Sequence, residues 1–230
     1  MLIKYVGHAC FKIRDNETGY SIVLDPYKYG SVDGYGKIVD SASEVLCSHE
    51  HDDHHGVEHI NIEHMDESPF EVTWIDTFHD PEKGALRGPN RIHIITSKRT
   101  GEKMVHYGDV GEKLDDLLTE ENLALLKDAD VAMVPVGGVY TYNKDEALEL
   151  IERTSPKLVL PMHYRSETLN FDFPHIDSIE KFLEASQKKG LKAFIAKMFF
   201  IDTDEYKLDC DILALMPQNM KPGITKKKED

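Results

Sequence analysis

The chain has 230 residues, of which 40% are hydrophobic, so it can bury a sizeable core and lies near the upper size of a single domain. Its formal net charge of −15 argues against binding to nucleic acid, because such binding depends on Lys and Arg side chains that neutralise phosphates. The three cysteines, Cys10, Cys47 and Cys210, lie far apart and suggest neither a disulfide framework nor a thiolate zinc site, which favours a reducing compartment.

Membrane insertion and secretion are not indicated by the hydrophobic pattern. The longest apolar runs fall well short of the roughly 20 residues that a bilayer-spanning helix needs. The apolar part of the N-terminal segment is too short for a secretion signal. We therefore expect a cytoplasmic protein.

The first half of the chain is predicted to be mostly sheet. Three short strands, at 2–6, 10–13 and 20–24, are separated by Gly7-His8 and by the turn-forming segment 15–19, and we expect them to run antiparallel. Runs of β-branched and aromatic residues predict further strands at 44–47, 71–78, 91–97 and 103–107.

After Asp109, helices and strands are predicted to alternate. The leucine spacing favours a helix over 111–118, and Asn143 with Glu146 forms the pattern of a capped helix start. The remaining predicted helices span 120–127 and 178–189, and the remaining strands span 130–136, 157–162 and 191–201. This order predicts sheets covered by helices, in one domain over 1–220 that is followed by a flexible tail of basic and acidic residues at 221–230.

The segment Val45–Gly56, VLCSHEHDDHHG, places four histidines and two aspartates directly after a short apolar run. Residues two apart on an extended backbone point to the same side, so His49 and His51 can bind one ion, while the turn beyond brings Asp53 and His54 toward a second. Imidazole and carboxylate ligands without thiolate suit zinc, and also manganese or iron. The alternative is a histidine-rich surface tract with incidental metal affinity, since six of the 12 histidines lie between 49 and 64.

Other residues of the metal-binding type also follow apolar runs. Asp25 follows YSIVL, His79 follows EVTWIDTF, Asp109 follows KMVHYG and His163 follows KLVLPM. Strand ends combine a rigid support with an accessible loop, which is where binding groups concentrate. The repeated placement predicts that several strand ends converge on one rim, and it favours a metal site over the surface tract.

Taken in order, these residues resemble the ligand pattern of the metallo-β-lactamase fold superfamily, and in detail a branch of small bacterial metal-dependent hydrolases. The matching blocks are Gly7-His8-Ala9, Asp25-Pro26, His79-Asp80 with Gly84 and Arg87-Gly88-Pro89-Asn90, Gly108-Asp109-Val110-Gly111, Pro135-Val136-Gly137-Gly138-Val139-Tyr140-Thr141 and Pro161-Met162-His163. The likeness spans about residues 2 to 200. Ser48 stands where Thr is commoner in the superfamily, and the insertion typical of RNA-cleaving relatives is absent.

The resemblance implies a four-layer αββα sandwich of the α/β class with two metal ions at one edge of the sheets. By the same resemblance, His49, His51 and His79 would bind the first ion, Asp53, His54 and His163 the second, and Asp109 would bridge both. The cofactors would be two divalent ions, with zinc favoured over manganese or iron. They would share a water whose pKa is lowered toward neutrality, and the resulting hydroxide would be the nucleophile.

The resulting hypothesis is a dinuclear hydrolase of a small, anionic ester, lactone or phosphoester, with Asp53, Asp109 and His8 as catalytic residues. The alternative is a catalytically silent metal-binding or ligand-sensing protein of the same fold. We expect a small-molecule substrate and neither nucleic acid nor a membrane as partner, and the sequence leaves a homo-oligomer open.

Several residues have competing interpretations. His8 is a general acid or substrate contact, or a buried structural histidine; Asp25 orients a ligand histidine, or starts a turn. Arg87 binds a substrate anion, or pins its own loop through a salt bridge. His106 has a core or surface position, or a catalytic role. The other assignments are a pocket lining for Tyr140 and Thr141, a core position for Trp74, and structural roles for His59, His64, His93 and His175.

Overall fold

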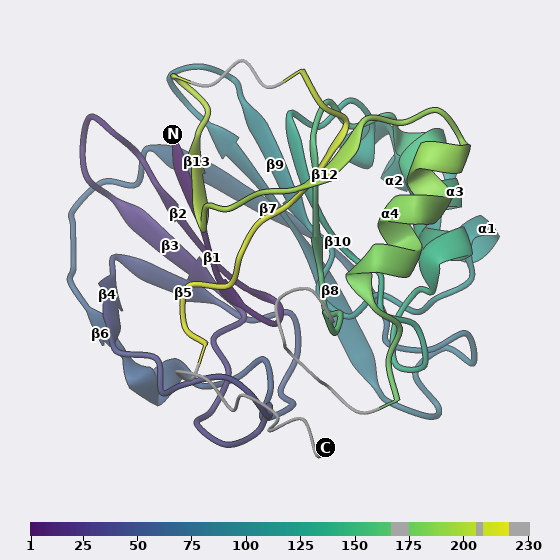
Figure 1. Cartoon of the computed structure of the whole chain (residues 1–230). Coiled ribbons are helices and arrows are strands. Elements are labelled where there is room, and N and C mark those ends of the chain that lie inside the picture. The colour runs from purple at the N-terminus through teal and green to yellow at the C-terminus, as the bar shows by residue number, and fades with distance from the viewer. Residues whose placement is uncertain (167–174, 206–208, 221–230) are drawn as a thin grey trace.

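Two sheets packed face to face form the centre of the molecule (Figure 1). The computed structural model describes residues 1–166, 175–205 and 209–220. The predicted tail at 221–230 lies outside the described residues. No helix in the described ranges is both long and apolar enough to cross a bilayer.

The first sheet has five strands in the order β13-β1-β2-β3-β5. These are β1 (Leu2–Gly7), β2 (Cys10–Arg14), β3 (Ser21–Leu24), β5 (Glu44–Leu46) and β13 (Phe200–Asp202). The first three pair antiparallel, as predicted, and β5 lies parallel to β3. Strands β3 and β5 therefore end at the same edge of the sheet.

The second sheet has seven strands in the order β12-β14-β11-β10-β9-β8-β7. They are β7 (Phe70–Phe78), β8 (Pro89–Ser97), β9 (Lys103–His106), β10 (Val131–Pro135), β11 (Val159–Met162), β12 (Ala193–Ile195) and β14 (Ile212–Ala214). Strands β9, β10, β11 and β14 are parallel, and β8 runs antiparallel between β9 and β7. Hence β7, β9 and β11 all end at one edge.

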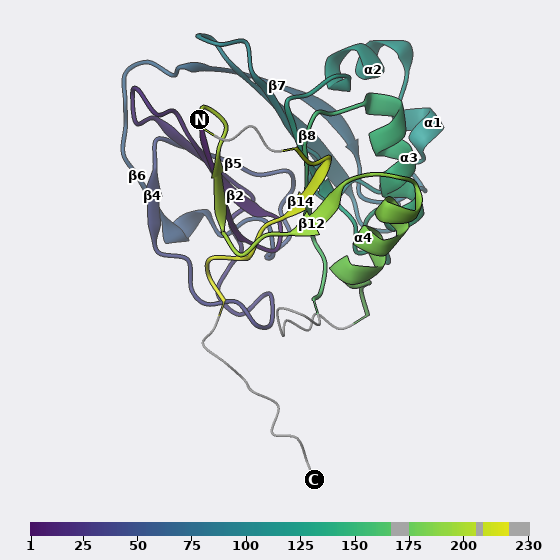
Figure 2. The ribbon, with the colours of Figure 1, turned by 45° about the horizontal axis from the view of Figure 1, so that its top comes forward.

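The main core lies between the two sheets and continues under the helices. Alternation along β1 and β2 turns Ile3, Tyr5 and Phe11 into this core, while Lys4 and Lys12 face outward. The helices α1 (Leu114–Leu117), α2 (Glu120–Leu126), α3 (Lys144–Thr154) and α4 (Ile179–Lys188) cover the outer face of the seven-stranded sheet (Figures 1 and 2). Helix α3 begins with the predicted capping box, in which Asn143 and Glu146 bond each other's backbone amides.

The outer face of the five-stranded sheet carries a second apolar cluster. It contains Val6, Cys10 and Val23 from that sheet and Tyr27, Tyr35 and Ile60 from the covering layer. That layer consists of connecting segments, the short pair β4 (Asp40–Ala42) with β6 (Ile60–Ile62), and the 3-10 helix η1 (Val57–His59) (Figure 2). The predicted α/β fold class is confirmed, with these elements in the place of an α-helix on this side.

Three local predictions were wrong. The run 191–201 is not one strand, because β12 joins the seven-stranded sheet and β13 pairs with β1 in the other. The helix over 111–118 shortens to α1, because the Gly111 and Glu112 amides donate to the Phe78 carbonyl and hold the chain at the sheet edge. Trp74 is 52% exposed on edge strand β7, where the Arg91 guanidinium lies 4.9 Å from its ring centroid.

Candidate metal centre

The strand ends converge on one rim, as the sequence predicted. Asp25 follows β3, His79 follows β7 and His163 follows β11 directly. His49 lies three residues beyond the end of β5, and Asp109 lies three beyond β9. Because these strands share a direction within each sheet, their ends place the five side chains at one edge of the sandwich.

All seven predicted metal ligands lie within this cluster. Three groups of ligand atoms, each within 4.8 Å of one another, are His49 with His51 and His79, His49 with His54 and Asp109, and His8 with Asp53, His54 and His163. The first group is the set predicted for the first ion. The third is the set predicted for the second ion, with His8 added. Their assignment as ligands stays a prediction.

Asp109 lies between the two sets. Its Oδ2 is 3.1 Å from His54 Nε2, 3.1 Å from His79 Nε2 and 3.3 Å from His163 Nε2. Asp109 is buried, and its Oδ1 has no hydrogen-bond partner among the described residues. Asp109 therefore lies within reach of histidines from both sets.

A buried carboxylate orients two of the histidines. Asp25 Oδ2 accepts hydrogen bonds from Ser48 Oγ at 2.6 Å and from His54 Nδ1 at 2.7 Å, and Asp25 Oδ1 accepts one from the Ser48 amide at 2.6 Å. Since the Ser48 hydroxyl donates to Asp25, it must accept from His49 Nδ1, 2.9 Å away. We assign the Nδ1 tautomer to both rings on this network, which leaves Nε2 of His49 and of His54 free to bind a cation. The prediction that Asp25 orients a ligand histidine agrees with its bond to His54.

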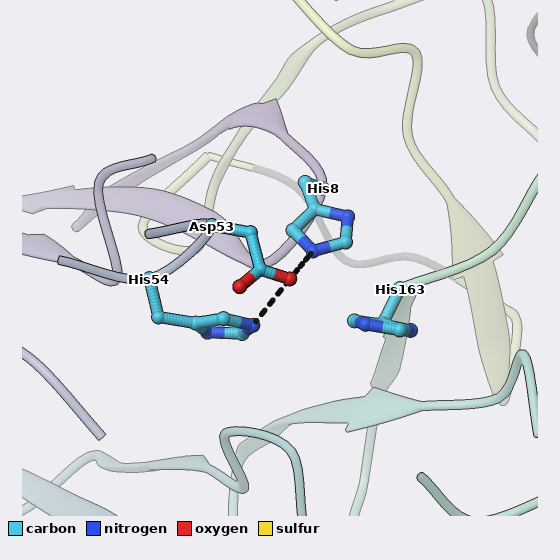
Figure 3. Close-up of side chains that lie close together, drawn as sticks. All are labelled: His8, Asp53, His54 and His163. Atoms are coloured by element: carbon cyan, nitrogen blue, oxygen red, sulfur yellow. Dashed lines mark hydrogen bonds and ion pairs between the residues drawn. The ribbon is translucent and has the colours of Figure 1, made fainter. Parts of the chain in front are cut away.

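His8 closes the other side of the cluster (Figure 3). Its Nε2 lies 3.1 Å from Asp53 Oδ2, and its ring centroid is 4.4 Å from that of His163. His54 Nε2 lies 3.7 Å from the same Asp53 oxygen. The Asp53 side chain is 25% exposed, whereas those of His8, His54 and His163 are buried, so Asp53 lies at the solvent-facing side of the group.

Backbone conformation helps to aim these side chains. His8, Asp25 and His163 have φ values of 57°, 44° and 53°, in the left-handed region that residues other than glycine seldom adopt. Each follows a strand end and turns the chain sharply there. A Cβ on Gly137 would overlap the His163 carbonyl oxygen, so only glycine lets the β10 loop pack against that turn. Such strain persists where the surroundings hold it and is common at functional sites.

Burial and neighbouring charges shift the pKa values of these groups in different directions. Although burial opposes its ionised form, His163 and His54 hold the pKa of Asp109 well below its usual range. The pKa of His54 is raised, because the Asp109 and Asp25 carboxylates outweigh burial. Burial and the nearby His54 lower the pKa of His49 to about 3, and burial together with His163 lowers that of His8 to about 4. The imidazoles of His49 and His8 are therefore neutral at pH 7.

The donor set fits divalent cations. His49 Nε2 is buried without a hydrogen-bond partner among the described residues, like Asp109 Oδ1. Buried polar atoms are almost always hydrogen-bonded. The two unpaired acceptors, His49 Nε2 and Asp109 Oδ1, therefore indicate a place for a cation. Imidazole and carboxylate ligands suit zinc, manganese or iron.

Two positioning residues were not recognised from the sequence. Asn90 is buried, and its side chain accepts from the Asp109 amide at 2.9 Å and donates to the Tyr107 carbonyl at 3.0 Å, which fixes the turn that carries Asp109. Asp80 accepts from the backbone amides of Leu86 and Arg87 at 3.1 and 2.8 Å, and so folds the loop after His79. Only the matching blocks HD…RGPN hinted at either role.

The structure also places the other residues that had competing interpretations. Arg87 forms no ion pair in the described part of the chain, which contradicts the salt-bridge interpretation; its guanidinium lies 5.3 Å from the Tyr140 ring centroid. Thr141 is buried and donates to the Tyr142 carbonyl, so it does not line an open pocket. The structural roles of the other histidines agree with their positions: His93 and His106 are buried and bond the backbone, His59 accepts from the Tyr29 amide, and His64 and His175 are exposed.

Comparison with known proteins places the chain in a family. The model of the β-lactamase superfamily domain matches residues 2–163, more than half of the chain. The chain belongs to this superfamily. The resemblance to this superfamily is thereby confirmed.

Two relatives match this superfamily member over almost their whole length. A UPF0173 metal-dependent hydrolase of Methanocaldococcus jannaschii is 26% identical over 227 residues, which cover 86% of this chain and 97% of the relative. One from Nanoarchaeum equitans is 26% identical over 229 residues, covering 85% and 96%. Among solved structures, a Thermotoga maritima protein assigned to the Zn-dependent hydrolases of the metallo-β-lactamase superfamily aligns with a TM-score of 0.68 and 25% identity, over 93% of this chain and 97% of its own. Igni18, a metallo hydrolase of Ignicoccus hospitalis, shares the fold with a TM-score of 0.57 and 20% identity, over 82% and 91%.

Proposed function

We propose that the protein is a dinuclear metal-dependent hydrolase that cleaves a small, anionic ester, lactone or phosphoester. The observation that carries the proposal is the position of Asp109, whose Oδ2 lies within 3.3 Å of histidines from three separate segments. The names of the relatives support a metal-dependent hydrolysis.

The residues divide into two metal-binding sets. In the proposal, His49, His51 and His79 would hold one ion and Asp53, His54 and His163 the other, and Asp109 would lie within reach of both. Two bound divalent ions would supply Lewis acids for the substrate oxygens and would lower the pKa of a water shared between them. This chemistry removes the need for a serine or cysteine nucleophile.

The remaining groups place the reactants. Asp53, at the solvent-facing side, would orient the attacking water, accept its proton at a carboxylate oxygen and return that proton to the leaving oxygen. His8 Nε2, 3.1 Å from Asp53 Oδ2, holds that carboxylate in place and contacts the substrate from the β1–β2 turn. The Asp25–Ser48 network keeps Nε2 of His49 and His54 directed inward. Asn90 fixes the turn that carries Asp109 by accepting a hydrogen bond from the Asp109 amide.

The test is a substrate screen with the metal content measured in parallel. Protein loaded with zinc, and separately with manganese, is assayed against a panel of carboxylic esters, lactones and phosphodiesters. We expect product from at least one class, and its loss in Asp109→Ala together with the metal. Protein that retains two ions yet yields no product from the whole panel would instead support the silent metal-binding alternative.

A further inference from the structure

Two loops meet beside the metal centre. The first, residues 80–88, starts directly after His79 and returns to it, since the His79 amide donates to the Gly88 carbonyl at 3.1 Å. The second, residues 137–142, packs Gly137 against the His163 carbonyl, and its Tyr142 amide donates to the Val110 carbonyl at 3.1 Å. Both loops are therefore anchored on residues that are, or adjoin, the predicted metal ligands.

The tips of these loops are joined by one contact. The Arg87 guanidinium lies 5.3 Å from the centroid of the Tyr140 ring, a distance at which a cation is attracted to the ring face. The Arg87 backbone is also fixed, because its amide donates to the buried Asp80 carboxylate at 2.8 Å. Arg87 is thus held at both its backbone and its side chain, which lowers the entropic cost of binding a ligand.

Among the described residues, Arg87 lacks the acidic partner that another stacked arginine of this protein has. Arg91 lies over Trp74 in the same way, with its centre 4.9 Å from the ring centroid, but Asp76 binds its guanidinium at 2.9 Å. In the described ranges no carboxylate pairs with Arg87. The planar donors of Arg87 match a carboxylate or phosphate.

Apolar side chains accompany this cation on both loops. Leu86, next to Arg87, is 66% exposed, and Val139, next to Tyr140, is 58% exposed. Val139 also has a φ of 63°, which a β-branched residue adopts only at a cost of about 1–2 kcal/mol. Strain of this kind persists at ligand clamps, where the surroundings hold it. The loop pair therefore offers a cation beside exposed apolar surface.

We propose that Arg87, held over Tyr140, is the specificity-determining residue of the substrate site, and that the substrate is an ester that carries an oxyanion on an apolar chain. This inference rests on the proposed function and deepens it. The acyl or alkyl chain contacts Leu86 and Val139, the anion binds the guanidinium, and the ester bond reaches the metal centre behind the loops.

A matched pair of esters tests the proposal. Mono(4-nitrophenyl) glutarate and 4-nitrophenyl valerate differ only in a terminal carboxylate against a methyl group. Release of nitrophenolate by the zinc-loaded protein gives kcat/KM for each. We expect wild type to favour the glutarate ester, and Arg87→Gln to reduce that preference about 10- to 100-fold, as loss of a charged hydrogen-bonded pair predicts. The change should be in KM, which a merely structural link between the loops would not produce selectively.

Two further variants keep the result interpretable. Arg87→Lys keeps the charge without the planar fork and should lose most of the preference. Arg99→Gln removes the same charge on the β8–β9 turn, where Arg99 pairs only with Glu17 among the described residues, and should leave both activities unchanged. An unchanged preference in Arg87→Gln would overturn the inference while leaving the proposed function intact.

Failure of the proposed function has a different signature. If neither ester is hydrolysed, binding of free glutarate to the zinc-loaded protein is measured by calorimetry. Binding that weakens at least tenfold in Arg87→Gln supports the inference, by the same charged contact. Absent binding, or equal binding by both proteins, overturns it.

Discussion

Replacing Asp25 by Asn should weaken both metal-binding sets at once. The Asp25 carboxylate accepts three hydrogen bonds, from the Ser48 amide, the Ser48 hydroxyl and His54 Nδ1, at 2.6, 2.6 and 2.7 Å. His49 belongs to the same network, because its Nδ1 lies 2.9 Å from the Ser48 hydroxyl. An amide in place of the carboxylate turns an NH2 group toward at least one of these donors.

The expected loss of metal affinity follows from the role of Asp25 in orienting histidines. Loss of a group that orients a metal-binding histidine costs about 10–100-fold in metal affinity, or about 1.4–2.7 kcal/mol. Because Asp25 orients His54 directly and His49 through Ser48, we expect this loss at both ions. In Ser48→Ala the bond to His54 remains and only His49 loses its partner, so the loss should be confined to the ion that His49 binds.

The assay is a zinc titration against a fluorescent chelator, with two binding steps resolved for wild type, Asp25→Asn and Ser48→Ala. Asp40→Asn is the matched control, because Asp40 pairs with Lys12 at 2.7 Å on the outer side of the five-stranded sheet and carries the same charge. Wild-type affinity at both steps in Asp25→Asn would refute the account of this network. An equal loss at both steps in Ser48→Ala would refute the separate roles of His49 and His54.

Three other predictions concern the support of the site. Asn90→Ala should lower the free energy of unfolding by about 1–3 kcal/mol in urea titrations, because the Asp109 amide and the Tyr107 carbonyl are left buried without partners; an unchanged midpoint would contradict this. Gly137→Ala should lower the thermal midpoint or prevent folding, because the new Cβ overlaps the His163 carbonyl oxygen, and wild-type melting would show that the turn can shift. Zinc at about 100 times its dissociation constant should stabilise the protein by about 2.7 kcal/mol for each bound ion over protein in EDTA, and Asp109→Ala should abolish that difference in calorimetry.

The sequence predicts the strands near the site well, for a physical reason. Apolar runs such as SIVL and VLPM are buried on both faces and lead directly into polar residues, so their ends are visible without knowledge of the partners. The parallel pairing of β3 with β5 then brings Asp25 near Ser48. The metal-binding pattern was recognisable because all seven of its members lie either at the ends of such runs or in one segment.

Elements that depend on distant pairing escaped prediction. Strands β4, β6 and β14 have three residues each, too few to show a period. The run 191–201 shows one continuous apolar pattern, yet the chain leaves one sheet and enters the other within it. Trp74 looks like a core residue by composition, but an edge strand leaves one face open to solvent.

The supporting residues escaped for a related reason. Asn90 and Asp80 act through backbone amides, and a single Asn or Asp carries no sign of which amide it will meet. The sequence also does not indicate the left-handed φ values at His8, Asp25 and His163, since none of the three is glycine. The sequence therefore predicts the residues that would contact the ions, but not most of the residues and backbone conformations that orient these side chains.

The most direct test of the central claim is the metal content of the purified protein, measured by elemental analysis after loading and gel filtration. The account predicts two divalent ions per chain in wild type and a loss of both when Asp109 is replaced by Ala. A single ion, or none, in wild type would contradict it, as would two ions that persist in Asp109→Ala.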